Sequence, residues 1–210
     1  MSWNDTTYLE QVALASMGYG LGALDGISGP KTTAAKSHWL NDRRGKGESS
    51  YPPASDYASM VDYYGKPGDE FELVTFEFPY DMKLAWDKSV TVTRSRCHRL
   101  IERPLLAALN ELLNTYGIEW ITKHGLDLFG GIYNDRNARG GSTKSKHAWG
   151  AAIDLNPSDN GNRTKWMQDE IGEKGFATMP IEAIEVFESH GFKSGARAWG
   201  RDAMHFQLTK

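Results

Sequence analysis

A run of glycine, serine, proline and charged residues between Arg43 and Pro53 divides the chain into a short and a long part. Such a run cannot bury enough apolar surface to order itself, so it is typical of linkers. We therefore predict a small module over residues 1–43, a linker over residues 44–70 and a larger domain over residues 71–210. The alternative is a single domain in which this segment forms a long surface loop.

The size and charge of the chain exclude several classes of protein. Its 210 residues suit a small module joined to one compact domain. The net charge is −3, so the chain lacks the positive field that binds nucleic acid or anionic membranes. No apolar run approaches the ~20 residues of a membrane span, and the N-terminus lacks the basic and apolar regions of a secretory signal. We expect neither a nucleic-acid partner nor membrane insertion. We also expect that the chain is synthesised in a cytoplasm.

Cys97 is the only cysteine, which excludes an intrachain disulfide and a cysteine-based zinc site. Any metal must then be held by histidine and carboxylate. One alternative function uses Cys97 as a nucleophile, because Arg94, Arg96 and Arg99 favour a thiolate. His98 is a poor base for that thiol, since adjacent residues of a helix or strand point apart.

The first 43 residues have the pattern of two short helices around a glycine turn. Thr7 and Glu10 have the spacing of a capping box, in which two side chains satisfy free amides at a helix start. Four apolar residues then recur on one helical face: Leu9, Val12, Ala13 and Met17. A second helix is predicted over residues 32–40.

The segment from Met17 to Ala35 resembles the peptidoglycan-binding repeat of bacterial and phage cell-wall hydrolases. That repeat has the pattern GY-x-G-x-x-DG-x-x-GP-x-T-x-x-A before a helix. The family usually ends this helix with Phe-Gln, whereas Trp39 and Leu40 stand here, so the module is shortened. The resemblance implies peptidoglycan as a partner.

The larger domain alternates helical and extended patterns and is predicted to be α+β, with a central antiparallel sheet. An apolar stripe at helical spacing predicts a helix over residues 105–116, and a second helix is expected over residues 180–190. The predicted strands cover residues 71–78, 118–122, 151–155 and 206–208.

Residues that could bind a metal are concentrated in two short segments, which contain His147, Asp154 and His205. Zinc accepts imidazole nitrogen and carboxylate oxygen, and a catalytic site keeps one of its four positions for water. Seven residues separate His147 from Asp154, which is roughly 10 Å along a helix and over 20 Å along a strand. Ligands of one ion cannot be so far apart, so the chain must bend between them. Gly150 is the expected bend, with Asp154 on a following strand.

Asp202 lies three residues before His205. A carboxylate at that position can lie near a metal-bound water without ligating the metal. It can take the proton of the water during attack on a carbonyl and return it to the leaving amine.

The joint pattern resembles the zinc D-alanyl-D-alanine carboxypeptidase and L-alanyl-D-glutamate peptidase family. Its signature is S-x-H-x-x-G-x-A-x-D, followed further along the chain by acid-x-x-His. The matching residues are Ser145, His147, Gly150, Ala152 and Asp154, then Asp202 and His205. The resemblance covers about residues 75–210. It implies that His147, Asp154 and His205 bind one zinc ion and that Asp202 is the general base.

The resemblance also suggests roles for polar residues upstream. The segment from Tyr133 to Gly140 is similar to the family segment whose arginine stabilises the developing oxyanion. This implies that role for Arg136, with Arg139 as a rival that would bind substrate; either is otherwise a solvated loop charge. Ser145 would help hold substrate or the ligand loop, or else its hydroxyl bonds the local backbone. Trp149 and Trp199 either wall the cleft or anchor the core.

The resemblance therefore implies a phage endolysin: a monomeric zinc peptidase that cleaves an amide bond of the peptidoglycan stem peptide. It would be made in the host bacterial cytoplasm and reach the wall through a holin. We expect L-Ala–D-Glu endopeptidase activity. The alternatives are D-Ala–D-Ala carboxypeptidase activity, cross-link D,D-endopeptidase activity, or a non-catalytic wall-binding protein.

Overall fold

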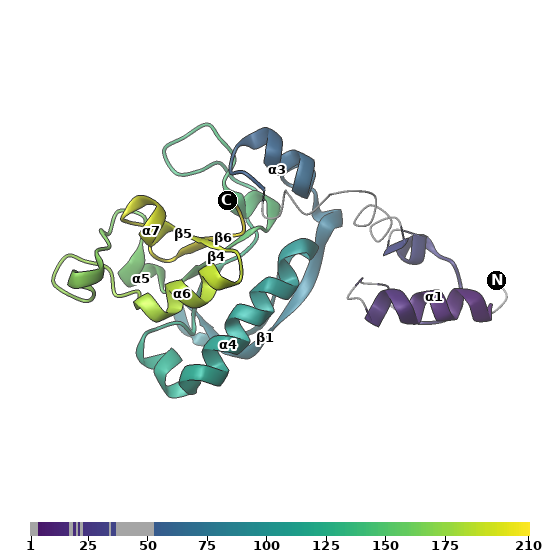
Figure 1. The fold of residues 1–210 in the computed structure, drawn as a ribbon, viewed down its shortest axis with the longest axis horizontal. Helices are drawn as coiled ribbons and strands as arrows, with labels where there is room; N and C mark the ends of the chain where they lie inside the picture. Colours follow the sequence, from purple (N-terminus) through teal and green to yellow (C-terminus); the bar gives the residue numbers. More distant parts are fainter. Residues whose placement is uncertain (1–3, 17–18, 20, 22, 34, 37–52) are drawn as a thin grey trace. The chain divides into compact units, whose positions relative to one another are not determined.

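The computed structural model describes residues 4–16, 19, 21, 23–33, 35–36 and 53–210. The chain divides into two compact units, Met1–Ser50 and Tyr51–Lys210 (Figure 1). Among the described residues, no helix has both the length and the apolar character that a membrane span requires.

The small unit is built around the helix α1 (Asp5–Ser16). Its N-cap is Asn4, whose side chain accepts a hydrogen bond from the backbone N–H of Thr7 at 2.9 Å, so the predicted Thr7–Glu10 capping box is wrong. The predicted buried face is also wrong, because Leu9 is 65% exposed and Val12 38% exposed. Met17 lies outside the described residues.

A buried glutamine sets the rotation of α1 instead. Gln11 accepts from the backbone N–H of Gly26 at 2.8 Å, and its amide nitrogen donates to Asp25 and Thr32 at 3.0 Å. These bonds turn Gln11 and Leu14 inward, and Leu14 packs in a small core with Leu21 and Ala35. The apolar pattern failed here because a polar side chain holds the glycine turn against the helix.

The second half of the predicted linker belongs to the larger unit. Helix α3 (Tyr57–Tyr64) begins after Asp56, whose carboxylate accepts from the backbone N–H of Ser59. Met60 and Tyr64 are buried in the main core, and the Tyr64 hydroxyl donates to the Leu208 carbonyl at 2.7 Å. The segment therefore docks against the end of the chain rather than spacing two domains. Residues 44–52 lie outside the described part.

The larger unit contains a six-stranded sheet in the order β2-β1-β3-β4-β6-β5. Its strands are β1 (Leu73–Leu84), β2 (Asp87–His98), β3 (Leu128–Gly131), β4 (Ala152–Leu155), β5 (Lys193–Ser194) and β6 (His205–Gln207). Only the β1–β3 pair is parallel among the pairings of these strands. The predicted α+β class with a mostly antiparallel sheet is confirmed.

The long helix α4 (Arg99–Lys123) lies against β1 and α6 (Figure 1). It contains the predicted helix over residues 105–116, with Leu105, Leu109 and Leu112 fully buried. The predicted strand over residues 118–122 is wrong, because the helix kinks at Gly117 (φ 79°) and then continues. Trp120 stacks on Tyr116 at 4.4 Å between ring centroids, which is a contact of residues four apart on a helix.

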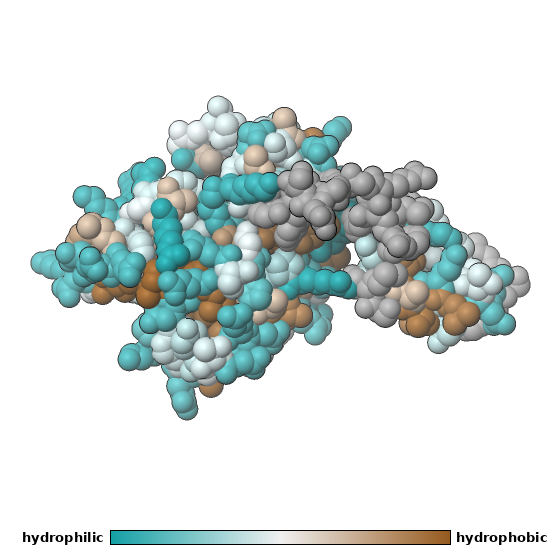
Figure 2. All heavy atoms as spheres, in the orientation of Figure 1, coloured by the Kyte–Doolittle hydropathy of each residue, from teal (hydrophilic) through white to brown (hydrophobic). Residues whose placement is uncertain are grey.

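Short helices complete the unit. They are α5 (Pro157–Asn160), α6 (Ile181–Ser189), α7 (Gly195–Trp199) and the 3-10 turns η1 (Glu70–Glu72), η2 (Lys146–Trp149) and η3 (Gln168–Glu170). The predicted helix over residues 180–190 corresponds to α6, which buries Ile184 and Phe187. Hydrophilic residues cover most of the visible face of this unit (Figure 2).

Candidate metal centre

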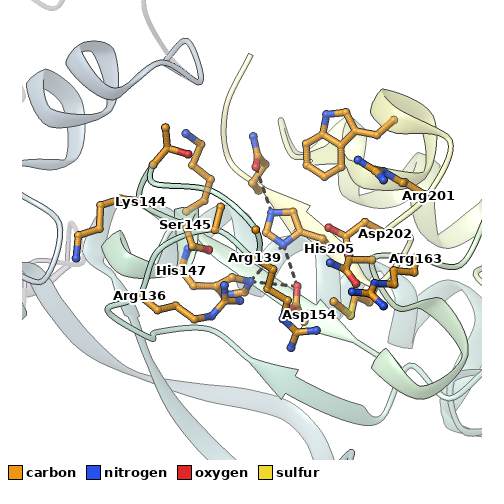
Figure 3. A pocket seen from close by; sticks show the side chains of 18 residues that line it. Arg136, Arg139, Lys144, Ser145, His147, Asp154, Arg163, Arg201, Asp202 and His205 are labelled. Carbon is orange, nitrogen blue, oxygen red and sulfur yellow. Dashed lines mark hydrogen bonds and ion pairs between the residues drawn. The ribbon is translucent and has the colours of Figure 1, made fainter.

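Three elements meet at the candidate site. Asp154 on β4 pairs directly with His205 on β6, and residues opposite each other in an antiparallel pair share one face of the sheet. His147 comes from η2, which precedes β4. Figure 3 shows the three side chains converging in one cavity.

The predicted bend between His147 and Asp154 is present at Gly150. This residue ends η2 in the left-handed conformation, with φ 65°. A Cβ atom there would lie 2.9 Å from the backbone nitrogen of His98. Glycine is therefore required both for its φ and for the close approach of β2. The turn brings the His147 ring to within 3.1 Å of the Asp154 carboxylate on β4.

The ligand atoms of the three residues lie within 4.8 Å of one another, and all three residues are buried. Oδ1 of Asp154 is 3.1 Å from Nε2 of His147 and 2.9 Å from Nδ1 of His205. The two ring nitrogens are 3.2 Å apart. This distance range allows a single cation to contact all three groups after small side-chain adjustments.

Carbonyl oxygens behind the rings determine which nitrogens face the centre. Nδ1 of His147 is 2.7 Å from the Ile132 carbonyl, and Nε2 of His205 is 3.1 Å from Oε1 of Gln207. A carbonyl oxygen only accepts, so each of these nitrogens donates its hydrogen. In the neutral rings, the other nitrogens then present lone pairs to Asp154. Two lone pairs and a carboxylate oxygen converge on one point, which is the donor set that a divalent cation requires.

The pKa shifts of Asp154 and His205 also favour positive charge at this point. Burial acts to raise the pKa of Asp154, but the charges of the two histidines and their hydrogen bonds outweigh it and lower the pKa. Burial acts to lower the pKa of His205, but its bond to Asp154 outweighs it and raises the pKa. Positive charge beside Asp154 is thus stabilised, whether a proton on the rings carries it or a cation bound to the neutral rings.

Asp202 borders the triad in a strained conformation. Its φ is 57°, which is uncommon for a residue other than glycine, and its carbonyl accepts from the backbone N–H of His205. Its Oδ1 is buried and has no hydrogen-bond partner in the described part of the chain. Burial raises the pKa of this carboxyl, with nearby His205 opposing the shift. Asp202 lines the same cavity as the triad, so its carboxylate lies where a water or substrate can bind.

A cavity of about 820 Å³ contains the triad, Asp202 and the other predicted site residues, Arg136, Arg139 and Ser145. Arg136 donates to the Asn137 carbonyl, and the Ser145 hydroxyl accepts from the backbone N–H of His147 at 3.4 Å. The serine therefore supports the ligand turn through the backbone, which is the alternative that the sequence left open.

The two tryptophans beside the motifs differ in role. Trp149 is buried and donates to the Gly65 carbonyl at 2.8 Å, so it anchors the core. Trp199 is 46% exposed and lines the cavity.

The structure adds residues that the sequence reading missed. Gln207 lies two residues after His205 on β6 and contacts its ring. Arg163 and Arg201 also line the cavity. The period-two alternation of a strand places residues 205 and 207 on one face, which was the available signal for Gln207.

Cys97 does not have the environment of a nucleophile. It is fully buried, and burial, together with the charge of Glu102, raises the pKa of its thiol. Nε2 of His98 bonds the Tyr64 carbonyl rather than the thiol.

A family model described as D-alanyl-D-alanine carboxypeptidase matches residues 139–208. The matched range contains His147, Asp154, Asp202 and His205. The match supports a metallopeptidase of this family. Peptidases of this family are zinc enzymes, and the His-Asp-His group is compatible with that metal. Searches of curated proteins and of solved structures gave no match.

Proposed function

We propose that the protein is a zinc peptidase that hydrolyses the L-Ala–D-Glu bond of the peptidoglycan stem peptide, as a phage endolysin does. The observation that carries the proposal is the convergence of three metal-ligand groups beside a carboxylate oxygen without a hydrogen-bond partner in the described residues. The family match covers this whole constellation.

The metal would be held by Nε2 of His147, Nδ1 of His205 and Oδ1 of Asp154. Zinc in such a three-ligand site would act as a Lewis acid and lower the pKa of a water at its open position toward ~7. The Ile132 carbonyl and Gln207 keep the two rings oriented by accepting from their other nitrogens. Burial of the triad limits competing water around these groups.

Asp202 handles the proton in this mechanism. Its Oδ1 accepts a proton from the attacking water and then returns it to the nitrogen of the leaving amine. Arg136 donates hydrogen bonds to the substrate carbonyl oxygen as its negative charge develops, with Arg139 as the alternative donor. Each role uses a side chain that lines the same cavity as the triad.

Fragment analysis tests the bond that is cut. Purified peptidoglycan is digested with the zinc-loaded full chain, and the products are identified by mass spectrometry. New N-terminal D-Glu is expected. New N-terminal diaminopimelate or free D-Ala would assign the cross-link or the D-Ala–D-Ala bond instead. The variant His205→Ala serves as the inactive control.

We also propose that residues 1–43 bind the wall and that the monomer reaches it through a holin. The support is the resemblance of the segment from Met17 to Ala35 to a wall-binding repeat. A tethered binding module raises the local enzyme concentration on a polymer. Full-length His205→Ala should sediment with purified walls. If it sediments while the intact protein releases no fragments, the protein is a wall binder without this activity.

A further inference from the structure

The cavity around the triad has a strongly positive lining. Its basic residues are Arg136, Arg139, Lys144, Lys146, Arg163 and Arg201, whereas its acidic residues are Asp154 and Asp202. The chain as a whole has a net charge of −3. The positive lining is therefore a local property of the cavity and not a reflection of the overall composition.

Interactions within the protein already engage several of these cations. Lys144 forms an ion pair with Asp135 at 2.6 Å, and Lys146 donates to the Ser55 carbonyl. The charge of Arg139 acts on Asp202. Arg163 and Arg201 are exposed and have no carboxylate partner within the residues that the structure describes. Two guanidinium groups are thus available to a ligand.

The backbone holds Arg163 and Arg201 on one wall of the cavity. An antiparallel bridge joins Lys165 to Arg201, and the backbone N–H of Trp166 donates to the Gly200 carbonyl at 2.8 Å. Arg163 lies in the turn just before this bridge, and its side chain lines the same cavity as that of Arg201. Figure 3 shows both arginines on the Asp202 side of the triad, with Arg136 on the His147 side.

A planar guanidinium group binds a carboxylate through two parallel hydrogen bonds, which makes arginine suited to this anion. Both groups line the same cavity, so each can reach an anion that is bound there. We propose that Arg163 and Arg201 bind free carboxylates of the substrate, so that the cleft selects an acidic peptide with two or more carboxylates beside the cleaved bond. This inference rests on the proposed peptidase function.

The inference favours the L-Ala–D-Glu bond over the D-Ala–D-Ala bond. In a stem peptide, D-Glu linked through its side chain keeps its own α-carboxylate free, and diaminopimelate adds further carboxylates. All of these lie on the amine side of the L-Ala–D-Glu bond. The terminal residue after a D-Ala–D-Ala bond has a single carboxylate, and one arginine would be enough to bind it.

Binding to the metal-free protein tests the proposal independently of cleavage. The chelator-treated full chain is titrated by calorimetry with the tripeptide L-Ala–γ-D-Glu–diaminopimelate and with its fully amidated analogue. The intact protein should prefer the acidic peptide. Arg163→Gln and Arg201→Gln should each weaken binding roughly fivefold, and the double variant tenfold or more. The amidated analogue should not distinguish these variants.

Lys165→Gln is the matched control, because it removes a positive charge beside Arg201 without lining the cavity. It should change affinity less than about twofold, since an isolated exposed charge contributes little. With zinc-loaded enzyme, the double variant should raise KM and leave kcat unchanged.

Equal affinity for the acidic and amidated peptides would overturn the proposal, as would a double variant that binds like the intact protein. If poly(glycerol phosphate) binds more tightly than the acidic peptide and its binding depends on Arg163 and Arg201, these arginines bind a polyphosphate and not a peptide. Arginine-dependent peptide binding without wall cleavage would leave this site standing and refute the proposed peptidase function.

Discussion

At the scale of single residues, the orientation of each of the two candidate histidine ligands depends on an acceptor behind its ring. Gln207 accepts from Nε2 of His205, and its amide nitrogen is itself directed to the Thr209 hydroxyl at 2.5 Å. Such supporting contacts fix both the tautomer and the ring plane of a ligating histidine. The positions of two ligand atoms are therefore determined by groups that do not contact the metal.

Gln207→Leu removes the acceptor and should lower zinc affinity about 10- to 100-fold. Competition with a fluorescent chelator measures the change. Gln207→Glu keeps an acceptor oxygen and should retain affinity close to that of the intact protein. If the leucine variant binds zinc normally, the glutamine has no role in positioning His205.

Asp202→Asn preserves the size of the side chain but cannot take a proton from water. We expect kcat for stem-peptide cleavage to fall about 10²- to 10⁴-fold. The zinc content, measured by mass spectrometry of the purified protein, should stay the same. A variant with unchanged kcat would exclude Asp202 as the base.

At the scale of elements, the start of α7 determines where Asp202 lies. A Cβ atom on Gly195 would be 2.3 Å from the Asp202 carbonyl oxygen and 2.9 Å from the Trp199 ring. The segment that carries the proposed base therefore packs directly on a helix start that lacks a side chain. Asp202 has a positive φ in this tightly packed segment.

Gly195→Ala should push this segment away and destabilise the larger unit by about 1–3 kcal/mol. Thermal unfolding measures the loss of stability, and kcat should fall as well because Asp202 moves. Gly141→Ala is a suitable control, since its Cβ would meet neighbours only at ordinary contact distances of 3.8–3.9 Å. Equal stability of the two variants would show that the α7 contact is readily relaxed.

The sequence predicted elements whose burial is one-sided. The helices α4 and α6 each bury an apolar stripe, so their periodicity was visible. Strand β2 was not predicted: most of its residues are exposed, and the alternation of Val90 and Val92 with polar residues is short. Likewise, α1 was predicted as a helix but with the wrong face, because the polar residue Gln11 lies beside Leu14 on its inner side.

The candidate site was predictable where its residues are close in sequence or belong to a motif. The spacing of His147 and Asp154 required a bend, and Gly150 provides it. Arg163 and Arg201 could not be predicted as neighbours. Their common wall depends on a bridge between segments more than thirty residues apart, and local sequence does not encode such pairings.

At the scale of the whole molecule, the proposed metal joins distant parts of the larger unit. A ligand that binds only the folded state stabilises it by RT ln(1 + [L]/Kd), which is about 4 kcal/mol when zinc is a thousandfold above its Kd. Scanning calorimetry should therefore show that the unfolding temperature of the larger unit rises when zinc is added and falls when a chelator is added.

The variant His205→Ala provides the control for this stabilisation, because it removes one of three ligands and should abolish most of the zinc dependence. The substitution does not alter the apolar core residues, such as Leu109 and Phe187. An unchanged zinc response would mean that the stabilising ion binds elsewhere.

The direct pairing of Asp154 with His205 across β4 and β6 has a consequence for how the chain reaches its fold. A slip of one residue in this pairing would turn one of the two side chains to the opposite face. The shifted arrangement would present only two ligands and would hold the ion weakly. An ion present during folding would therefore stabilise correctly aligned strands and leave misaligned ones free to separate. The ion would in this way select the correct pairing of the two strands.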